Sequence, residues 1–316
     1  MTKSYVGIDV SKARLDVAVV GHVALIGQPP FSCTNDEVGR SALVERLKKI
    51  SPELIVLEAT GGYERAIVLA LDELRIPAAV INPRQGRDFA KALGILAKTD
   101  RIDAKVLARF ARDVRPKPRP RLDAQGRALD ALVKRRRQVL DDLSAERHRA
   151  HRAEPPVRDF VLAHIAVLRD EKKVLNCAIE AAIAANPLWV EKANLIRSVP
   201  CAGPILCMTV LADLPELGLL SRKKIAALVG VAPVNDESGM MKNRRVIRGG
   251  RGQVRVVLYM AALAATRRNH TIAVFYKRLV DGGKPPKLAL TACMRKLLLI
   301  LNCVVRTGKP WRGGPP

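Results

Sequence analysis

Four carboxylates in the first third of the chain have the types and the spacing of a metal site. Asp9 ends a predicted strand that begins at Tyr5, and Glu58 ends a short, apolar predicted strand. Asp100 and Asp103 stand three apart at the start of a predicted helix, and residues at that spacing share one helix face. Oxygen ligands suit Mg²⁺ or Mn²⁺, and such ions stabilise the attacking and leaving oxygens of a phosphodiester. The four residues, here called the acidic site, therefore predict a divalent-cation centre for phosphodiester chemistry.

Each of these carboxylates also has a structural interpretation. Asp9 could cap a turn, Asp100 could be a helix N-cap, and Asp103 could interact with the helix dipole. Taken singly, these three favour the structural interpretation. Glu58 differs, because a charge that follows Leu-Ile-Val-Leu needs a cationic partner, such as a lysine or a metal ion. Taken together, in a basic protein, the four favour the metal site.

The elements that must position the acidic site alternate between strand and helix. Alternation and short apolar runs predict strands over 5–9, 15–20, 53–58 and 78–82, with a further one possible around 22–31, and helices over 36–49, 63–74, 86–93 and 99–111. A strand, a helix and a second strand imply a parallel pair. Open α/β sheets carry their chemistry at the carboxyl ends of the strands, which is where Asp9 and Glu58 fall.

Charge indicates a nucleic-acid partner. The 316 residues contain 55 Lys and Arg against 30 Asp and Glu, a formal net charge of +25. Residues 1–104 hold 14 basic and 13 acidic residues, whereas 105–316 hold 41 and 17. A compact body with that charge repels itself until a polyanion neutralises it. Aromatic residues make up only 3%, so phosphate contacts, rather than base stacking, are expected to dominate binding.

The basic part of the chain is predicted to be mostly helical. Three prolines over 116–121 predict a stiff basic linker, and 122–185 predicts two antiparallel helices that break at Pro155 and Pro156. The segment 195–204 is similar to a helix-hairpin-helix, although this signal is weak alone. On the first long helix, Lys134, Arg135, Arg136 and Arg137 form either a solvated face or a phosphate-binding one.

A serine lies beside a cluster of cations in the last third of the chain. Ser238 precedes Gly239, and serine before glycine is ordinarily a turn residue. The segment 242–251, here called the cationic strip, follows with arginines spaced by glycines. Such a strip could fix a phosphate next to the hydroxyl and stabilise charge on phosphorus. The sequence therefore makes Ser238 a candidate nucleophile as well as a turn residue.

These motifs, taken in order along the chain, resemble the DEDD transposases of the insertion-sequence-110 family. The strings that carry the resemblance are Tyr5–Lys12, Leu57–Tyr63, Val80–Pro83, Lys98–Ala104, Ala226–Pro233 and Glu237–Gly239. The resemblance implies an α/β protein with three regions: a RuvC-like ribonuclease-H domain over 1–115, a basic linker and antiparallel helical hairpin or coiled coil over 116–190, and a small, mostly helical transposase domain over 191–316. It also implies that Asp9, Glu58, Asp100 and Asp103 bind Mg²⁺ or Mn²⁺.

The same resemblance implies a mechanism and partners. Ser238 would attack the scissile phosphate and form a covalent phosphoserine, with the acidic site and the serine meeting across subunits of a dimer or tetramer. A guide RNA would pair with both donor and target DNA. The cations expected to bind nucleic acid are Lys98, Lys134, Arg135, Arg136, Arg137, Lys242, Arg244, Arg245, Arg248 and Arg251.

Composition disfavours other classes. The six cysteines include no C-x-x-C pair, so neither a zinc ribbon nor a disulfide framework is indicated. Gly249–Gly252 lacks the lysine and hydroxyl of a phosphate loop. The longest apolar run, near 297–305, is shorter than a membrane span, and a cytoplasmic, nucleoid-associated bacterial protein is expected. Two alternatives remain: a structure-specific nuclease that uses water as its nucleophile, and a non-catalytic nucleic-acid scaffold.

Overall fold

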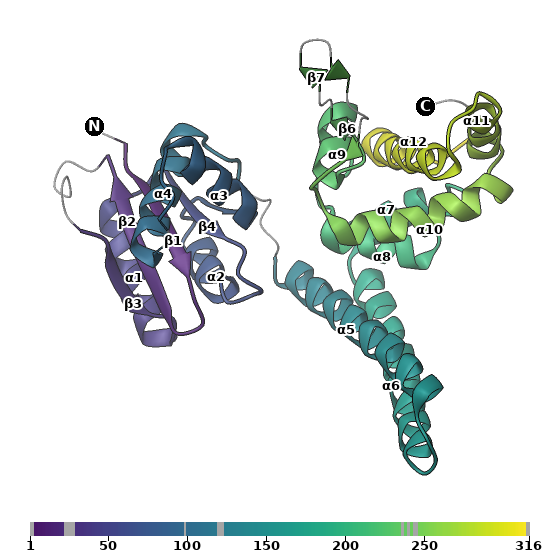
Figure 1. Ribbon diagram of the computed structural model, residues 1–316, viewed down its shortest axis with the longest axis horizontal. Helices are drawn as coiled ribbons and strands as arrows, with labels where there is room; N and C mark the ends of the chain where they lie inside the picture. Colours follow the sequence, from purple (N-terminus) through teal and green to yellow (C-terminus); the bar gives the residue numbers. More distant parts are fainter. Residues whose placement is uncertain are drawn as a thin grey trace. The chain divides into compact units, whose positions relative to one another are not determined.

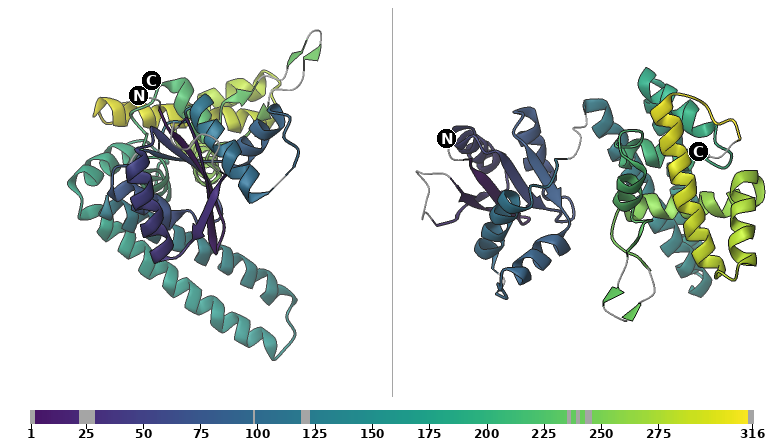
Figure 2. Two further views of the ribbon diagram at one scale, coloured as in Figure 1. Left: turned by 90° about the vertical axis from the view of Figure 1, so that its left-hand side faces the viewer. Right: turned by 90° about the horizontal axis from the view of Figure 1, so that it is seen from above.

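The computed structural model describes residues 3–21, 29–97, 99–118, 123–234, 237–238, 241–242 and 246–313, without the side chains of 234–242. The chain forms two compact units, Met1–Arg121 and Leu122–Pro316 (Figures 1 and 2). The first contains a sheet covered by helices, and the second is mostly helical. The division falls at the proline-rich segment, where three prolines exclude helix.

The sheet of the first unit mixes antiparallel and parallel pairs. Its strands run in the order β3-β2-β1-β4-β5, with bounds β1 Tyr5–Val10, β2 Arg14–Val20, β3 Phe31–Thr34, β4 Leu54–Glu58 and β5 Ala78–Ile81. The pairs β1–β2 and β2–β3 are antiparallel, while β1–β4 and β4–β5 are parallel. The predicted strands and the predicted parallel pair are confirmed. The possible strand around 22–31 reduces to β3 in the described part, because 22–28 lie outside it.

Helices cover both faces of this sheet. On one face, α1 (Glu37–Ile50) and α2 (Arg65–Glu73) bury their leucines and isoleucines against Ile8, Ile55 and Leu57. On the other, α4 (Asp100–Asp113) packs Leu107 and Phe110 against the alternate residues of the same strands. Burial on both faces explains why β1 and β4 are almost wholly apolar.

Helix α4 comes unusually close to the central strand β1. A Cβ on Gly7 would lie 2.2 Å from the backbone oxygen of Ala104 and 2.2 Å from the backbone nitrogen of Ala108. Only glycine permits this approach. The contact fixes the first turn of α4 beside the carboxyl end of β1.

Helix α3 (Pro83–Ala92) begins three residues earlier than the sequence indicates. Pro83 lies between the strand predicted over 78–82 and the helix predicted over 86–93, and a proline there would ordinarily interrupt the chain. Instead it occupies the first helical turn, where the missing N–H of proline costs nothing. The Asn82 side chain accepts from the Arg84 backbone N–H at 2.9 Å, and the Gln85 side chain accepts from the Asn82 N–H at 3.2 Å. This capping box turns a predicted break into a helix start.

The second unit begins with two long antiparallel helices. They are α5 (Ala124–Arg152) and α6 (Val157–Ala184), separated at Pro155–Pro156 as predicted. The remaining helices, which share one large hydrophobic core with the adjoining ends of α5 and α6, are α7 Pro187–Arg197, α8 Pro204–Asp213, α9 Arg222–Val229, α10 Gly252–Arg268, α11 His270–Asp281 and α12 Pro286–Thr307. Two short strand pairs join α9 to α10: β6 (Pro233–Val234) with β9 (Val246–Ile247), and β7 (Glu237–Ser238) with β8 (Met241–Lys242).

Among the described residues, α12 is long and apolar enough to cross a membrane by length and composition alone, with a mean hydropathy of 1.9 over its most apolar stretch. The run is longer than the sequence-based estimate. More than half of that stretch is buried inside the unit, and Leu297, Leu298 and Ile300 are fully buried. The apolar character of α12 is that of a core helix.

Candidate active site

The sheet register places Asp9 and Glu58 side by side. Ile8 pairs with Leu57 across the parallel β1–β4 ladder, so Asp9 and Glu58 are the next residues on the two strands. Side chains alternate along a strand, and Asp9 therefore shares the face of Gly7, on which α4 packs. Both carboxylates lie at the carboxyl ends of their strands, as predicted.

The first turn of α4 brings the other two carboxylates to this face. The Thr99 hydroxyl accepts from the Ile102 backbone N–H at 3.3 Å and caps the helix. The N-cap is therefore Thr99, and the N-cap interpretation of Asp100 is wrong. Asp100 and Asp103 lie in the first turn, with Asp103 partly buried and the Asp100 side chain 58% exposed.

The acidic site holds like charges close together. Burial, together with the negative charges of Asp103 and Asp100, raises the pKa of Asp9 from its ordinary value of 3.8 to about 6. A carboxyl that loses its proton reluctantly beside other carboxylates is stabilised by a cation. This electrostatic frustration is what an oxygen-liganded divalent ion relieves, so the donor set fits Mg²⁺ or Mn²⁺.

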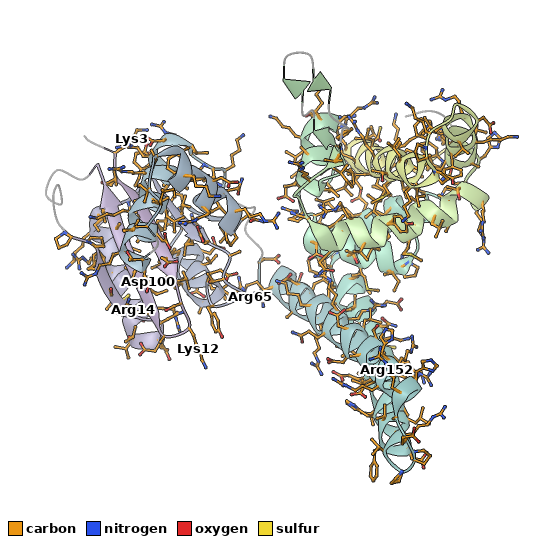
Figure 3. All side chains as sticks on the ribbon, viewed as in Figure 1. Lys3, Lys12, Arg14, Arg65, Asp100 and Arg152 are labelled. Atoms are coloured by element: carbon orange, nitrogen blue, oxygen red, sulfur yellow. The ribbon has the colours of Figure 1, made fainter. Side chains whose placement is uncertain are left out.

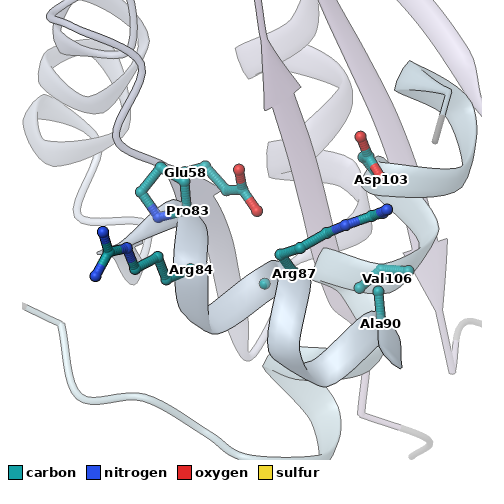
Figure 4. Close-up of a pocket in the computed structure, with 8 residues that line it drawn as sticks. Glu58, Pro83, Arg84, Arg87, Ala90, Asp103 and Val106 are labelled. Atoms are coloured by element: carbon teal, nitrogen blue, oxygen red, sulfur yellow. The ribbon is translucent and has the colours of Figure 1, made fainter. Parts of the chain in front are cut away.

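A cavity opens between α3, α4 and the end of β4. It has a volume of about 310 Å³ and is lined by Glu58, Pro83, Arg84, Gly86, Arg87, Ala90, Asp103 and Val106 (Figure 4). Gly86 lets α3 approach, since a Cβ there would lie 2.1 Å from Glu58 Oε1. Glu58 and Asp103 thus share one cavity although 45 residues separate them in sequence.

The four carboxylates are gathered at one edge of the sheet but are not drawn onto one point. Within the described residues, no three acidic, histidine or cysteine side chains form a group that could hold a metal ion as they stand. Asp100 is instead engaged by Arg14, whose Nη2 donates to its Oδ2 at 3.1 Å (Figure 3). Binding of an ion between all four would require their side chains to move closer together.

A fifth acid, Asp16, lies next to Asp9 and was missed from the sequence. Asp16 pairs directly with Asp9 across β1 and β2, and it is only 2% exposed. Arg14 Nε donates to it at 3.0 Å, and Ser32 Oγ donates at 2.5 Å. Arg14 thereby links Asp16 to Asp100. The available signal was an aspartate within the otherwise apolar strand 15–20.

The glycine-rich string after Glu58 forms a fixed loop. The Glu64 carboxylate accepts from the backbone N–H groups of Thr60 at 3.1 Å and of Gly62 at 2.9 Å. Gly61 and Gly62 have φ values of 70° and 114°, which L side chains adopt only with strain. Glu64 and the two glycines hold the chain that leaves Glu58.

Ser238 lies on β7, in the hairpin that projects from the helices of the second unit in Figure 1. Its backbone pairs with Met241, but its side chain lies outside the described part of the structure. The base of the hairpin is tightly packed: a Cβ on Gly250 would lie 2.4 Å from the Gly230 nitrogen. Arg255 Nη1 also donates to the carbonyls of Val229, at 3.1 Å, and of Gly249. The chain is therefore firmly packed just before β6 and just after β9, the strand pair that precedes and follows the serine in sequence.

The predicted nucleic-acid-binding cations differ in their exposure and in their contacts with other protein groups. Arg136 is 8% exposed and donates to Asn176 at 2.7 Å, and Arg137 pairs with Asp213. Arg251 forms two hydrogen bonds to the Glu216 carboxylate, at 2.5 and 2.6 Å. The guanidinium groups of these three arginines are therefore already bound by other side chains of the protein.

The other predicted cations are more accessible or lie outside the description. Lys134 and Arg135 pair with Asp130 and Glu171 near the surface, and Arg248 is exposed. Lys98, Arg244 and Arg245 lie outside the described residues, as does the side chain of Lys242.

Comparison with known proteins defines the class. Residues 6–153 match the DEDD transposase domain of IS110 elements, and residues 193–277 match the transposase IS116/IS110/IS902 family. The protein is a DNA transposase or recombinase. It is 28% identical over 320 residues to the pilin gene-inverting proteins of Moraxella bovis and Moraxella lacunata, across 98% of both chains in each case. The chain belongs to the insertion-sequence-110 family of DEDD transposases.

Proposed function

We propose that this transposase cuts and rejoins DNA by divalent-cation chemistry at Asp9, Glu58, Asp100 and Asp103, on a RuvC-like ribonuclease-H fold. The observation that carries the proposal is the convergence of these four acids at one edge of the sheet. Burial, together with the charges of Asp103 and Asp100, raises the pKa of Asp9 at this edge to about 6. A fold that keeps such repulsion needs a compensating gain, and cation binding supplies it.

The residues of the chain have separate roles in this proposal. The bound ions would polarise the phosphodiester and stabilise charge on its oxygens. Asp9 and Glu58, fixed by the sheet, provide the rigid half of the site. Asp103 would join them from α4, and Asp100 would complete the set by turning from Arg14 toward the cation. Arg14 keeps its contact with Asp16 and does not become unpaired.

Ser238 is the proposed nucleophile. Its hydroxyl oxygen attacks phosphorus, the bond from phosphorus to the leaving deoxyribose oxygen breaks, and that oxygen takes a proton. The DNA end is then held as a phosphoserine until a second DNA hydroxyl displaces the serine. Support comes from the family resemblance around Glu237–Gly239 and from the neighbouring cationic strip.

The proposed partners follow the family as well. Donor and target DNA are chosen by a guide RNA that pairs with both, in the bacterial cytoplasm at the nucleoid, and a dimer or tetramer is the active assembly. The excess of cations and the small aromatic content support a protein that binds phosphates and leaves base reading to pairing. RNA that copurifies with the protein, from a host carrying the flanking DNA of its gene, should be one discrete non-coding species. Random cellular RNA would contradict the guided mechanism.

Covalent trapping tests the nucleophile. The protein is incubated with Mg²⁺, its copurified RNA and a plasmid that carries the DNA flanking its gene, and the reaction is stopped with detergent. Protein joined to cleaved DNA is expected for the wild type and not for Ser238→Ala. Asp103→Asn should form no adduct either. Free cleaved ends from an unimpaired Ser238→Ala variant would instead establish water as the nucleophile.

A further inference from the structure

The cavity beside the acidic site contains a cation that the proposed metal chemistry does not use. Arg87, on α3, lines the cavity together with Glu58 and Asp103. Figure 4 shows its guanidinium extending toward Asp103, whereas Arg84, one turn earlier on the same helix, points away from that residue. Two arginines of one helix therefore differ in how they meet the cavity.

The hydrogen bonding of Arg87 is incomplete. Its Nη2 donates to the Leu96 backbone oxygen at 3.2 Å, which ties the guanidinium to the segment before α4. Its Nη1 is buried and has no hydrogen-bond partner within the described residues. A buried donor without a partner is costly, and a charged one especially so. The guanidinium is thus held in place by one nitrogen, while the other is buried without a partner.

An anion is the ligand that suits this nitrogen. Guanidinium groups bind phosphate oxygens through short, charge-assisted hydrogen bonds. A phosphodiester that enters next to Glu58 and Asp103 brings a further negative charge, so it needs donors from the protein as well as cations on the carboxylates. Arg87 is partly buried and lines the wall where that phosphate would lie.

We propose that Arg87 forms a phosphate-binding subsite in this cavity, in which Nη1 donates to a non-bridging oxygen of the DNA phosphodiester at the acidic site. The inference rests on the proposed function and assigns a protein group to the substrate itself. The Leu96 carbonyl orients the guanidinium, and the unpartnered Nη1 binds the DNA. Loss of Arg87 therefore weakens contact with one phosphate, not with DNA in general.

A chemical double-mutant cycle tests this contact. The wild-type protein maps the phosphate it cleaves in Mg²⁺, and a second duplex is made with a neutral methylphosphonate at that position. Binding of both duplexes is then measured in Ca²⁺, which holds the complex before cleavage. We expect the methylphosphonate to weaken binding by the wild type about tenfold, as for one charge-assisted hydrogen bond, and by Arg87→Gln about twofold or less. Arg84→Gln is the matched control and should keep the wild-type penalty.

Two further measurements separate the subsite from structural roles. Arg87→Lys keeps the charge and a donor for Leu96, so it should melt as the wild type does, while its methylphosphonate penalty falls below the tenfold of the wild type. Mn²⁺ affinity should not fall in Arg87→Gln. Equal methylphosphonate penalties in the wild type, Arg87→Gln and Arg87→Lys overturn the proposal. An Asp103→Asn variant that still cleaves would overturn the proposed metal chemistry instead, so the two failures are distinguishable.

Discussion

The acidic site of the first unit and the partly buried ion pairs of the second unit arrange charged side chains differently. Around Asp9, carboxylates lie next to carboxylates, and burial together with the charges of Asp103 and Asp100 raises the Asp9 pKa to about 6. In the second unit, Arg137 lies against Asp213 and Arg251 against Glu216, each with a partner of opposite sign. Removing one partner of a buried pair leaves the other charge uncompensated, whereas gathered like charge costs stability as it stands and is typical of functional sites. The comparison supports the acidic site as the place of the proposed chemistry, although most of the net charge of the chain lies elsewhere.

The comparison is tested most severely by removing one of the gathered charges. Asp9→Asn keeps the shape of the side chain but removes an oxygen anion from the proposed cation site. DNA cleavage in Mg²⁺ should fall about 10³-fold, the scale on which loss of a preorganised electrostatic group acts. The matched control is Asp88→Asn, an exposed carboxylate on α3 that does not line the cavity. Near-normal cleavage by Asp9→Asn would contradict the proposal that cleavage depends on a cation bound at the acidic site.

Removing one partner of a paired charge should have the converse effect. Arg251→Ala leaves Glu216, 13% exposed, without its two hydrogen bonds, and it also removes a donor to the Asp213 carbonyl at 2.6 Å. We expect the free energy of unfolding to fall by about 3 kcal/mol, as for a broken buried pair. Urea denaturation measures this, with Lys223→Ala, at an exposed position of α9, as the control, which should change stability by less than about 0.5 kcal/mol. A stable Arg251→Ala variant that fails only in DNA binding would show instead that Arg251 binds nucleic acid, as the sequence predicted.

The cost of the acidic site should depend on pH. The folded-state pKa of Asp9, about 6, lies above its ordinary 3.8, so the folded protein binds this proton more tightly than the unfolded chain. The destabilisation is therefore fully present above pH 7, diminishes as pH falls through 6, and vanishes below 3.8. Without metal, Asp9→Asn should be more stable than the wild type by roughly 2 kcal/mol at pH 8. That difference should shrink towards pH 4. Thermal melts at both pH values, with and without Mg²⁺, measure it, and a pH-independent difference would contradict it.

Replacing glycine by alanine at two positions tests two different properties. At Gly7 it tests the packing of α4 on the sheet, and at Gly86 it tests metal binding by Glu58. Gly7→Ala would place a Cβ against the backbone of α4, which cannot move aside, so unfolding should become easier by about 2 kcal/mol or more. Gly86→Ala would meet the end of the Glu58 side chain, which can rotate away. It should keep the melting temperature within a few degrees while weakening Mg²⁺ binding about tenfold. Calorimetry of folding and of metal binding distinguishes the two, and a Gly86→Ala protein with normal metal affinity would show that Glu58 is not a ligand.

Local patterns predicted the elements better than the contacts between them. Apolar runs gave β1, β2, β4 and β5, and the 3.6-residue period with two prolines gave the paired helices α5 and α6. Spacing also indicated that Asp100 and Asp103 share a helix face, since that follows from local geometry. The engagement of Asp100 by Arg14, 86 residues away, depends on strand pairing and has no local signature.

The basic residues show the same limit. Lys134, Arg135, Arg136 and Arg137 form one cationic run in the sequence, yet Arg136 is buried while Arg135 is about half exposed. A run of like charges on a helix points in all directions, and only the packing of α5 against its neighbours decides which members reach solvent. The side of the helix that packs could not be read from charge alone.

The smallest effect is expected for Arg135, and it tests whether an exposed member of this cationic run binds phosphate. Arg135 pairs with Glu171 at 2.8 Å on the surface, and such pairs contribute less than about 1 kcal/mol. Arg135→Gln should therefore leave the melting temperature nearly unchanged. If Arg135 exchanges Glu171 for a phosphate, the slope of log affinity against log salt for duplex DNA or the copurified RNA should decrease by about one. Glu171→Gln should leave that slope intact and strengthen binding slightly, because it frees the guanidinium. An unchanged slope in Arg135→Gln would make this face of α5 a solvated surface and leave nucleic-acid binding to cations elsewhere in the chain.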